Sequence, residues 1–110
     1  MTEPAPGLTV VMTTVPKEDV AVRLARGLVE ARLAACVQVV PGARSFYVWE
    51  GEAQDEGEWL LFVKTVPEKR AELEAWLDEH HPYDLPEFVA LEGRGSERYA
   101  AWVAERVLGA

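Results

Sequence analysis

Cysteine and amide side chains are scarce in this chain. Cys36 is the single cysteine among 110 residues, so no internal disulfide can form, which fits a reducing compartment such as the cytoplasm. Asparagine is missing, glutamine occurs twice, and arginine outnumbers lysine. Few deamidation-prone amides are typical of thermophiles, although a GC-rich genome also favours arginine over lysine. We therefore expect a cytoplasmic protein from a thermophilic bacterium or archaeon.

Sequence motifs for phosphate binding, zinc hydrolysis and dithiol chemistry are also missing. The chain contains no phosphate-cradling glycine motif, no CxxC and no HExxH. Its two serines, Ser45 and Ser96, lie outside any nucleophile-elbow pattern. Because no nucleophile is recognisable beside a base, the sequence predicts a protein that is not an enzyme.

Long apolar runs and excess positive charge are missing as well. No stretch approaches the roughly 20 apolar residues of a membrane span. The net charge of -8 argues against nucleic acid and anionic membrane surfaces as partners; it is compatible with cation binding, but a solvated acidic surface explains it equally. With 49% apolar residues, the chain can bury a core. We expect a single domain over 1–110, in which residues 1–7 form a loose N-terminal arm.

Apolar periodicity and proline positions divide the chain into alternating strands and helices. We expect strands at 8–15, 35–49, 58–66 and 87–91, helices at 16–33 and 67–81, and a polar turn at 51–57. Ser96 is expected to cap a last helix, in which Tyr99, Trp102, Val103 and Val107 share a face. A Thr-Val-Pro step joins a strand to a helix at 14–16 and again at 65–67. This order predicts an α+β fold: a ferredoxin-like β-α-β-β-α-β sandwich with an antiparallel sheet and an extra C-terminal helix.

The run 35–49 is too long for a small domain. At about 3.3 Å per residue its fifteen residues would span roughly 50 Å, whereas the radius of gyration expected for this chain is about 13 Å. The run therefore either bends at Pro41-Gly42 or projects onto another subunit. The strand 58–66 is apolar on both faces, and one small subunit cannot cover both. Both features predict an oligomer.

Both histidines lie in the segment His80-His81-Pro82-Tyr83-Asp84-Leu85-Pro86-Glu87. Imidazole binds copper or zinc, so His80, His81 and Asp84 are candidate metal ligands. A purely structural turn explains the same residues. Because adjacent side chains at a helix end point in different directions, we expect His81 to be the ligand and His80 to complete the apolar stripe of the helix.

Lys64 and Cys36 lie in mostly apolar strands. A lysine in such a strand needs a carboxylate partner, which Asp84, Glu87 or a neighbouring subunit could supply; a catalytic lysine with a shifted pKa is the alternative. Cys36 is expected to be a buried structural thiol. Trp49 and the three other tryptophans are expected in the core or in interfaces.

A set of motifs occurs in a fixed order over 10–103: Thr14 with Pro16, LVEARLAACVQVVPGARSFYVWEGE at 28–52, Glu58, Lys64-Thr65, HHPYDLPE at 80–87, and Tyr99 with Trp102. With these motifs the chain resembles the CutA family of divalent-cation tolerance proteins.

This resemblance implies a homotrimer with the architecture of the PII regulatory proteins, and a role in tolerance of copper and other divalent cations. It implies candidate metal ligands at the paired histidines, His80 and His81. Some members carry a cysteine where this chain has Thr13, so we expect only weak copper binding here. The alternative function is a PII-like regulator or scaffold that binds a small molecule or a partner in clefts between subunits. Such a cleft would be lined by Trp49, Lys64, Tyr83 and Glu87.

Overall fold

The computed structural model describes residues 7–109, in which helices and strands alternate in the predicted order. Residues 1–6 of the predicted arm lie outside the described residues, and Gly7 opens the first strand. The last strand begins slightly later than predicted. The elements are β1 (Gly7–Val15), α1 (Glu18–Glu30), β2 (Cys36–Trp49), β3 (Glu52–Thr65), the 3-10 turn η1 (Pro67–Lys69), α2 (Arg70–His80), β4 (Val89–Arg94) and α3 (Glu97–Leu108).

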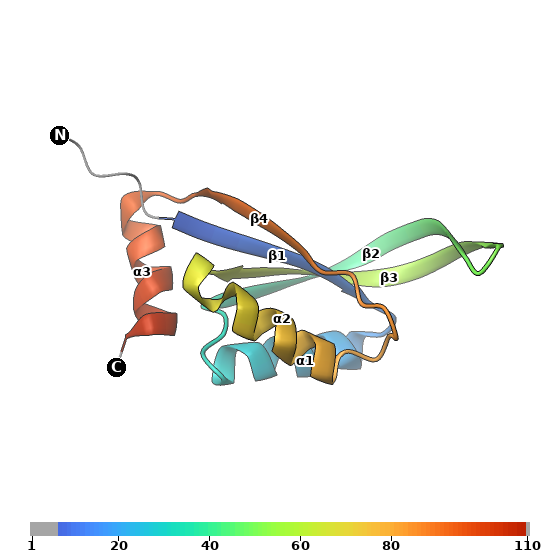
Figure 1. Cartoon of the computed structure of the whole chain (residues 1–110), viewed down its shortest axis with the longest axis horizontal. Coiled ribbons are helices and arrows are strands. Elements are labelled where there is room, and N and C mark those ends of the chain that lie inside the picture. The colour runs from blue at the N-terminus through green and yellow to red at the C-terminus, as the bar shows by residue number, and fades with distance from the viewer. Residues whose placement is uncertain (1–6, 110) are drawn as a thin grey trace.

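The four strands form one antiparallel sheet in the order β2-β3-β1-β4, and α1 and α2 lie along the same face of it (Figure 1). This arrangement confirms the predicted ferredoxin-like α+β fold. Alternate residues of the central strands pack on the apolar stripes of the two helices because strand side chains repeat every second residue and helix side chains every third or fourth. The fully buried members of this core include Val11, Val15, Leu24, Leu28, Leu61, Val63 and Leu73.

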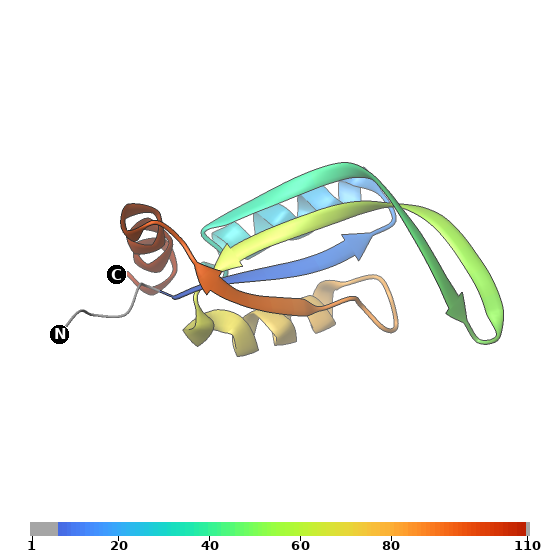
Figure 2. The same ribbon diagram turned by 90° about the horizontal axis from the view of Figure 1, so that it is seen from above.

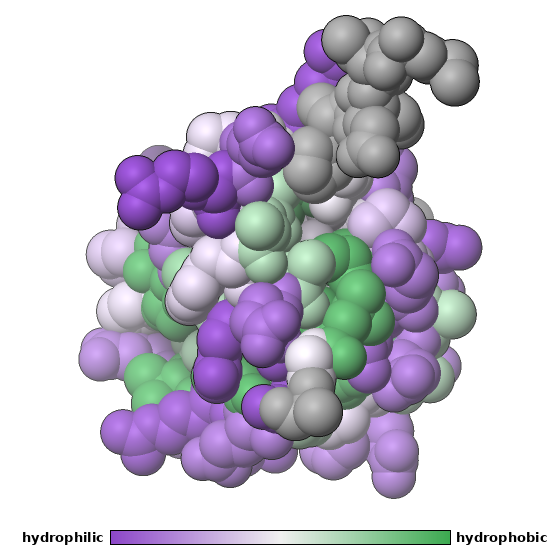
Figure 3. All heavy atoms as spheres, turned by 90° about the vertical axis from the view of Figure 1, so that its left-hand side faces the viewer, coloured by the Kyte–Doolittle hydropathy of each residue, from purple (hydrophilic) through white to green (hydrophobic). Residues whose placement is uncertain are grey.

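The helix α3 packs at the end of the sheet, away from α1 and α2. Its first turn is capped as predicted, since the backbone N–H of Tyr99 donates to Ser96 Oγ at 3.2 Å. Figure 3 looks onto this end and shows hydrophobic patches between hydrophilic residues. The helix contributes to a second small core, made of Leu8, Ala35, Val66, Val103 and Val107.

The buried face of α3 differs from the predicted one. Tyr99 is 38% exposed and Trp102 is 45% exposed, so the prediction that both share the face of Val103 is wrong. Ala100 is buried in their place, because the short side chain lets the helix approach the sheet closely. The two aromatic rings contact each other on the surface, with centroids 5.8 Å apart.

The hairpin of β2 and β3 extends beyond the rest of the domain (Figures 1 and 2). The domain measures 54 × 28 × 23 Å, and its radius of gyration of 15.1 Å exceeds the roughly 13 Å of a compact chain of this length. The pairing register shifts between Val40 and Ala43, where Pro41 and Gly42 interrupt β2. The long run therefore bends at Pro41-Gly42 as predicted and also extends beyond its own domain. That it reaches another subunit stays a prediction.

The turn of this hairpin is shorter than the sequence predicted. Glu50 and Gly51 both have positive φ, at 50° and 82°, which is the conformation of a two-residue type I′ turn. The strand β3 begins at Glu52, so the polar turn predicted over 51–57 is wrong. Polar residues are tolerated in this part of β3 because the two-stranded ribbon is exposed to solvent. Arg44 and Asp55 form a bidentate ion pair across it, with both distances 2.8 Å.

The sheet face opposite α1 and α2, here called the open face, stays partly exposed beyond α3. It corresponds to the second apolar face that the sequence predicted for 58–66. Val40, Val89 and Leu91 on this face are 39%, 42% and 52% exposed. Its other apolar members, Val10, Met12, Leu60 and Phe62, are half-buried. No helix among residues 7–109 has the length and apolar character needed to cross a membrane.

Candidate functional site

A pocket of about 1010 Å³ lies where the hairpin passes the loop between α2 and β4. Its wall combines aromatic and acidic side chains from the hairpin and from that loop. It brings together Trp49, Tyr83 and Glu87, three of the four residues predicted to share a cleft, together with Asp84. The fourth, Lys64, does not line it. Tyr47 and Glu56 also line the pocket and were not among the predicted site residues. Tyr47 lies between the apolar residues Phe46 and Val48 on an exposed strand, whereas no pattern marks Glu56.

Glu58 is the most buried acid of this pocket, at 7% exposure. The Tyr83 hydroxyl donates to Glu58 Oε2 at 2.8 Å. Burial and this hydrogen bond raise the pKa of Tyr83 far above its ordinary value, so the phenol keeps its proton. Burial, helped by the negative charge of Glu58, also raises the pKa of Glu87. The carboxylates of the pocket therefore repel one another electrostatically.

His81 fixes the loop that forms one wall of the pocket. The ring is 8% exposed, and Nε2 lies 2.9 Å from the carbonyl oxygen of Thr14. Because a carbonyl only accepts, Nε2 carries the proton, and Nδ1 accepts from the backbone N–H of Tyr83 at 3.2 Å. Burial lowers the pKa of His81, although the Thr14 hydrogen bond and the charge of Glu58 oppose that shift. Both ring nitrogens thus have protein partners.

His80 has the opposite surroundings. Its exposed ring stacks on Trp76 with centroids 4.0 Å apart, and Nδ1 donates to the Trp76 carbonyl oxygen at 2.7 Å. Nε2 is then the unprotonated nitrogen of the neutral ring. The prediction that His80 is the core residue is wrong, because α2 ends at His80, where the side chain is exposed, and the extended backbone of His81 turns its ring back toward Thr14. The role of His81 as a ligand stays a prediction.

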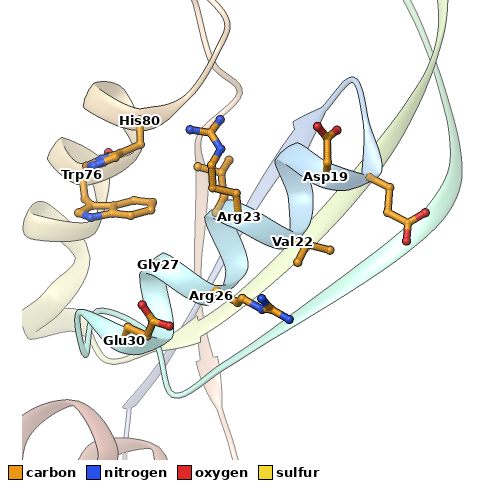
Figure 4. A pocket seen from close by; sticks show the side chains of 10 residues that line it. Asp19, Val22, Arg23, Arg26, Gly27, Glu30, Trp76 and His80 are labelled. Atoms are coloured by element: carbon orange, nitrogen blue, oxygen red, sulfur yellow. The ribbon is translucent and has the colours of Figure 1, made fainter.

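A shallow groove between α1 and α2 holds His80 and Trp76. Figure 4 shows these two side chains on α2, and Arg23, Gly27 and Glu30 on the facing helix α1. A Cβ on Gly27 would lie 2.6 Å from Trp76 Cζ2, so glycine is what allows the indole to cross α1 so closely. The sequence analysis missed this groove; a glycine within a helical pattern was the available signal.

Lys64 and Cys36 face each other across β2 and β3 on the open face. The Lys64 ammonium donates to Gln38 Oε1, so the salt bridge predicted with Asp84 or Glu87 is not formed within the chain. A contact with a neighbouring subunit stays a prediction. Cys36 is half-buried rather than fully buried, and its structural role also stays a prediction.

The candidate metal ligands do not form a complete set within one chain. Over residues 7–109, no three His, Cys, Asp or Glu side chains are grouped so that they could hold a metal ion. His80, His81 and Asp84 would therefore need further ligands from another molecule or from solvent. Their role as ligands stays a prediction.

Residues 9–106 match the family described as CutA1 divalent ion tolerance protein. The divalent-cation tolerance protein CutA of Thermus thermophilus is 46% identical over 97 residues, which cover 87% of this chain and 94% of that protein. Protein CutA, chloroplastic, of Arabidopsis thaliana is 41% identical over 95 residues, covering 86% of this chain and 52% of that protein, so this chain spans about half of it. The crystal structure of CutA1 from Oryza sativa superposes with a TM-score of 0.90 at 36% identity, covering 96% of this chain and 98% of that one. This chain therefore belongs to the CutA1 divalent ion tolerance protein family.

Proposed function

We propose that this protein acts in divalent-cation tolerance, and in copper and heavy-metal homeostasis, as a cytoplasmic homotrimer that binds metal ions weakly and catalyses no reaction. The observation that carries the proposal is the family match over residues 9–106. The chain carries a net charge of -8, which favours the approach of cations. Copper and other divalent ions are cargo in this proposal rather than a resident cofactor.

His80 supplies the metal contact in this proposal. Its ring is exposed and its Nε2 carries a free lone pair, because Nδ1 is the nitrogen that donates to Trp76. His81 would have to release Thr14 or Tyr83 before it could bind a metal. Asp84 is exposed in the following loop and offers oxygen. One imidazole with carboxylate and water ligands suits Cu(II) or Zn(II) and binds weakly.

Copper titration of the purified protein tests this assignment, with His80→Ala and His81→Ala as paired variants. We expect Cu(II) binding in the wild type to weaken at least tenfold in His80→Ala and to persist in folded His81→Ala. Affinity should fall as the pH is lowered, because an imidazole must be unprotonated to bind a metal ion. Unchanged affinity in both variants would show that the segment 80–87 is only a structural turn.

The homotrimer is supported by apolar surface that one chain leaves open. Phe46 and Val48 on the projecting hairpin are 68% and 71% exposed, and Val40, Val89 and Leu91 add exposed area on the open face. Stable homo-oligomer interfaces commonly bury about 2,000 Å² or more, and such surfaces are their usual components. Sedimentation equilibrium at micromolar concentration should give three times 12.2 kDa. A stable folded monomer there would contradict the proposal.

A second candidate function is a PII-like regulator or scaffold that binds a small molecule in its clefts. The pocket that joins Trp49, Tyr83 and Glu87 favours it, because these residues come from distant parts of the chain. Specific ligand sites combine apolar walls with a few convergent polar groups, as this pocket does. Metal titration separates the candidates, since a regulator of this kind needs no metal at His80.

A further inference from the structure

Glu58 is a buried carboxylate without a positive partner. Its side chain lines the pocket, is 7% exposed, and uses Oε2 to accept the Tyr83 hydroxyl. None of the salt bridges among residues 7–109 includes Glu58, and no described donor reaches Oε1. Oε1 is not among the fully enclosed polar atoms, so it faces the open pocket. Buried charges in proteins are normally paired, because removing an ionised carboxylate from water is costly. A cation supplied from outside the chain would complete this arrangement.

The surroundings of Glu58 determine which cation fits. Among residues 7–109, no lysine, arginine or histidine lines the pocket, whereas Glu56, Glu87 and Asp84 add further negative charge. Aromatic rings occupy much of the remaining wall, including those of Tyr47, Trp49, Tyr83 and Phe88. Aromatic faces attract ammonium groups and also bury apolar carbon, so they suit a cation that carries a hydrocarbon body.

A metal ion does not fit the same residues. A divalent ion needs several ligand atoms within about 2.0–2.6 Å of one point. The acids of this pocket do not form such a group among residues 7–109. They are spread along a pocket of about 1010 Å³, which is at the upper end of the sizes of small-molecule sites, roughly 300–1,000 Å³.

We propose that this pocket binds a small organic ammonium ion, whose charged head pairs with Glu58 and whose apolar body lies against Tyr47 and Trp49. The inference rests on the second candidate function and names its ligand class; it is independent of metal binding at His80. Tyr83 acts as a positioning residue, since its hydroxyl holds Glu58 Oε2 and leaves Oε1 for the ligand.

Calorimetric titration with phenethylammonium tests the proposal on the full-length wild-type protein. The matched probes are 2-phenylethanol, which keeps the ring without the charge, and phenylacetate, which reverses the charge. We expect saturable binding of the amine, at least tenfold weaker binding of the alcohol, and no binding of the acid. An alcohol that binds as well as the amine, or an amine that fails to bind, would overturn the proposal.

Glu58→Gln isolates the charge, because the amide oxygen can still accept from Tyr83. We expect amine affinity to fall at least tenfold. Glu52→Gln is the control, since it removes the same charge from an exposed site on β3 outside the pocket and should leave affinity within about twofold. If Glu58→Gln does not fold, Glu87→Gln removes a charge from a more exposed position of the same pocket. We expect this variant to bind the amine roughly threefold more weakly. Equal affinities in wild type and the folded pocket variant would refute the assignment.

A lysine from another copy of the chain is the competing occupant, and Lys64 is the candidate because its only described partner is the neutral Gln38. If Lys64→Met binds the amine and the wild type does not, the site belongs to that lysine and the proposal fails. Copper titration of the same samples separates the two proposals. If copper binds and the amine does not, only the ammonium site is rejected. If the amine binds and copper does not, only the metal role is rejected.

Discussion

Thr13 and Thr9 lie on the same face of β1 and are both fully buried, yet their hydroxyl groups differ in one respect. The Thr9 hydroxyl donates to Glu92 Oε2 at 2.7 Å. The Thr13 hydroxyl has no hydrogen-bond partner. Valine replaces either threonine with almost the same shape. The pair of substitutions therefore tests the cost of a single unsatisfied hydroxyl in this core.

The two substitutions should change the free energy of unfolding in opposite directions. A buried polar group without a partner costs about 1–3 kcal/mol, so Thr13→Val should stabilise the protein by about 1 kcal/mol. Thr9→Val removes a made hydrogen bond whose acceptor, Glu92, is exposed and can take water instead. That loss should cost about 1 kcal/mol. The two variants should thus differ by about 2 kcal/mol.

Urea unfolding followed by circular dichroism measures this difference. The midpoint should rise for Thr13→Val and fall for Thr9→Val with an unchanged slope, because neither substitution alters the surface exposed on unfolding. Protein concentration must be equal in all samples, since an oligomer unfolds in a concentration-dependent way. If both variants lose stability equally, the Thr13 hydroxyl has a partner and the reasoning is refuted.

Three further predictions concern other parts of the fold. Cys36→Ala should lower stability by about 1 kcal/mol and leave copper affinity unchanged; a tenfold loss of affinity would make Cys36 a ligand. The pKa of His81 is lowered from 6.5 in the folded state, so the unfolded chain binds a proton at this residue more readily than the folded one. The stabilisation by His81 should therefore be complete above about pH 6.5 and decline below it. Urea midpoints of wild type and His81→Gln from pH 5 to 8 check this, and parallel curves would contradict it. Gly51→Ala should lower the free energy of unfolding by about 1 kcal/mol, because φ at Gly51 is 82°. Gly57→Ala also meets open space but has no positive φ, so thermal melts of the two variants should show a smaller loss for Gly57→Ala.

Much of the fold could be predicted because proline positions and apolar periodicity agree along the chain. Pro16 and Pro67 each mark the step from a strand to a helix, and the core residues Leu24 and Leu73 follow at helical spacing. The hairpin ribbon could not be predicted in the same way. Its outer part is exposed on both sides, so no apolar alternation distinguishes strand from turn, and the acidic residues at 52–56 resembled a loop.

The candidate site was predicted in part, for a related reason. The resemblance to PII-like trimers implied a cleft between subunits lined by Trp49, Tyr83 and Glu87, and a pocket within one chain contains all three. The periodicity of apolar residues does not predict how a single side chain is oriented at the end of a helix or strand. His80 continues the helical spacing from Trp76, but at the last residue of α2 that spacing no longer points into the core. The role of His81 depends on the carbonyl of Thr14, which lies far away in the sequence.

The central position of β1 has a consequence for the order of folding. Thr9 pairs with Thr65 on one side and with Glu92 on the other, so one edge of the first strand stays unpaired until the last strand has been made. The hairpin of β2 and β3 is joined by Glu50 and Gly51 alone and can form within microseconds of synthesis. During translation the hairpin can pair with β1 and pack on α1 as soon as β3 has emerged, whereas the other edge of β1 stays unpaired until β4 is made. A pause in synthesis before Arg94 would prolong the stage in which that edge of β1 is open to pairing with another chain.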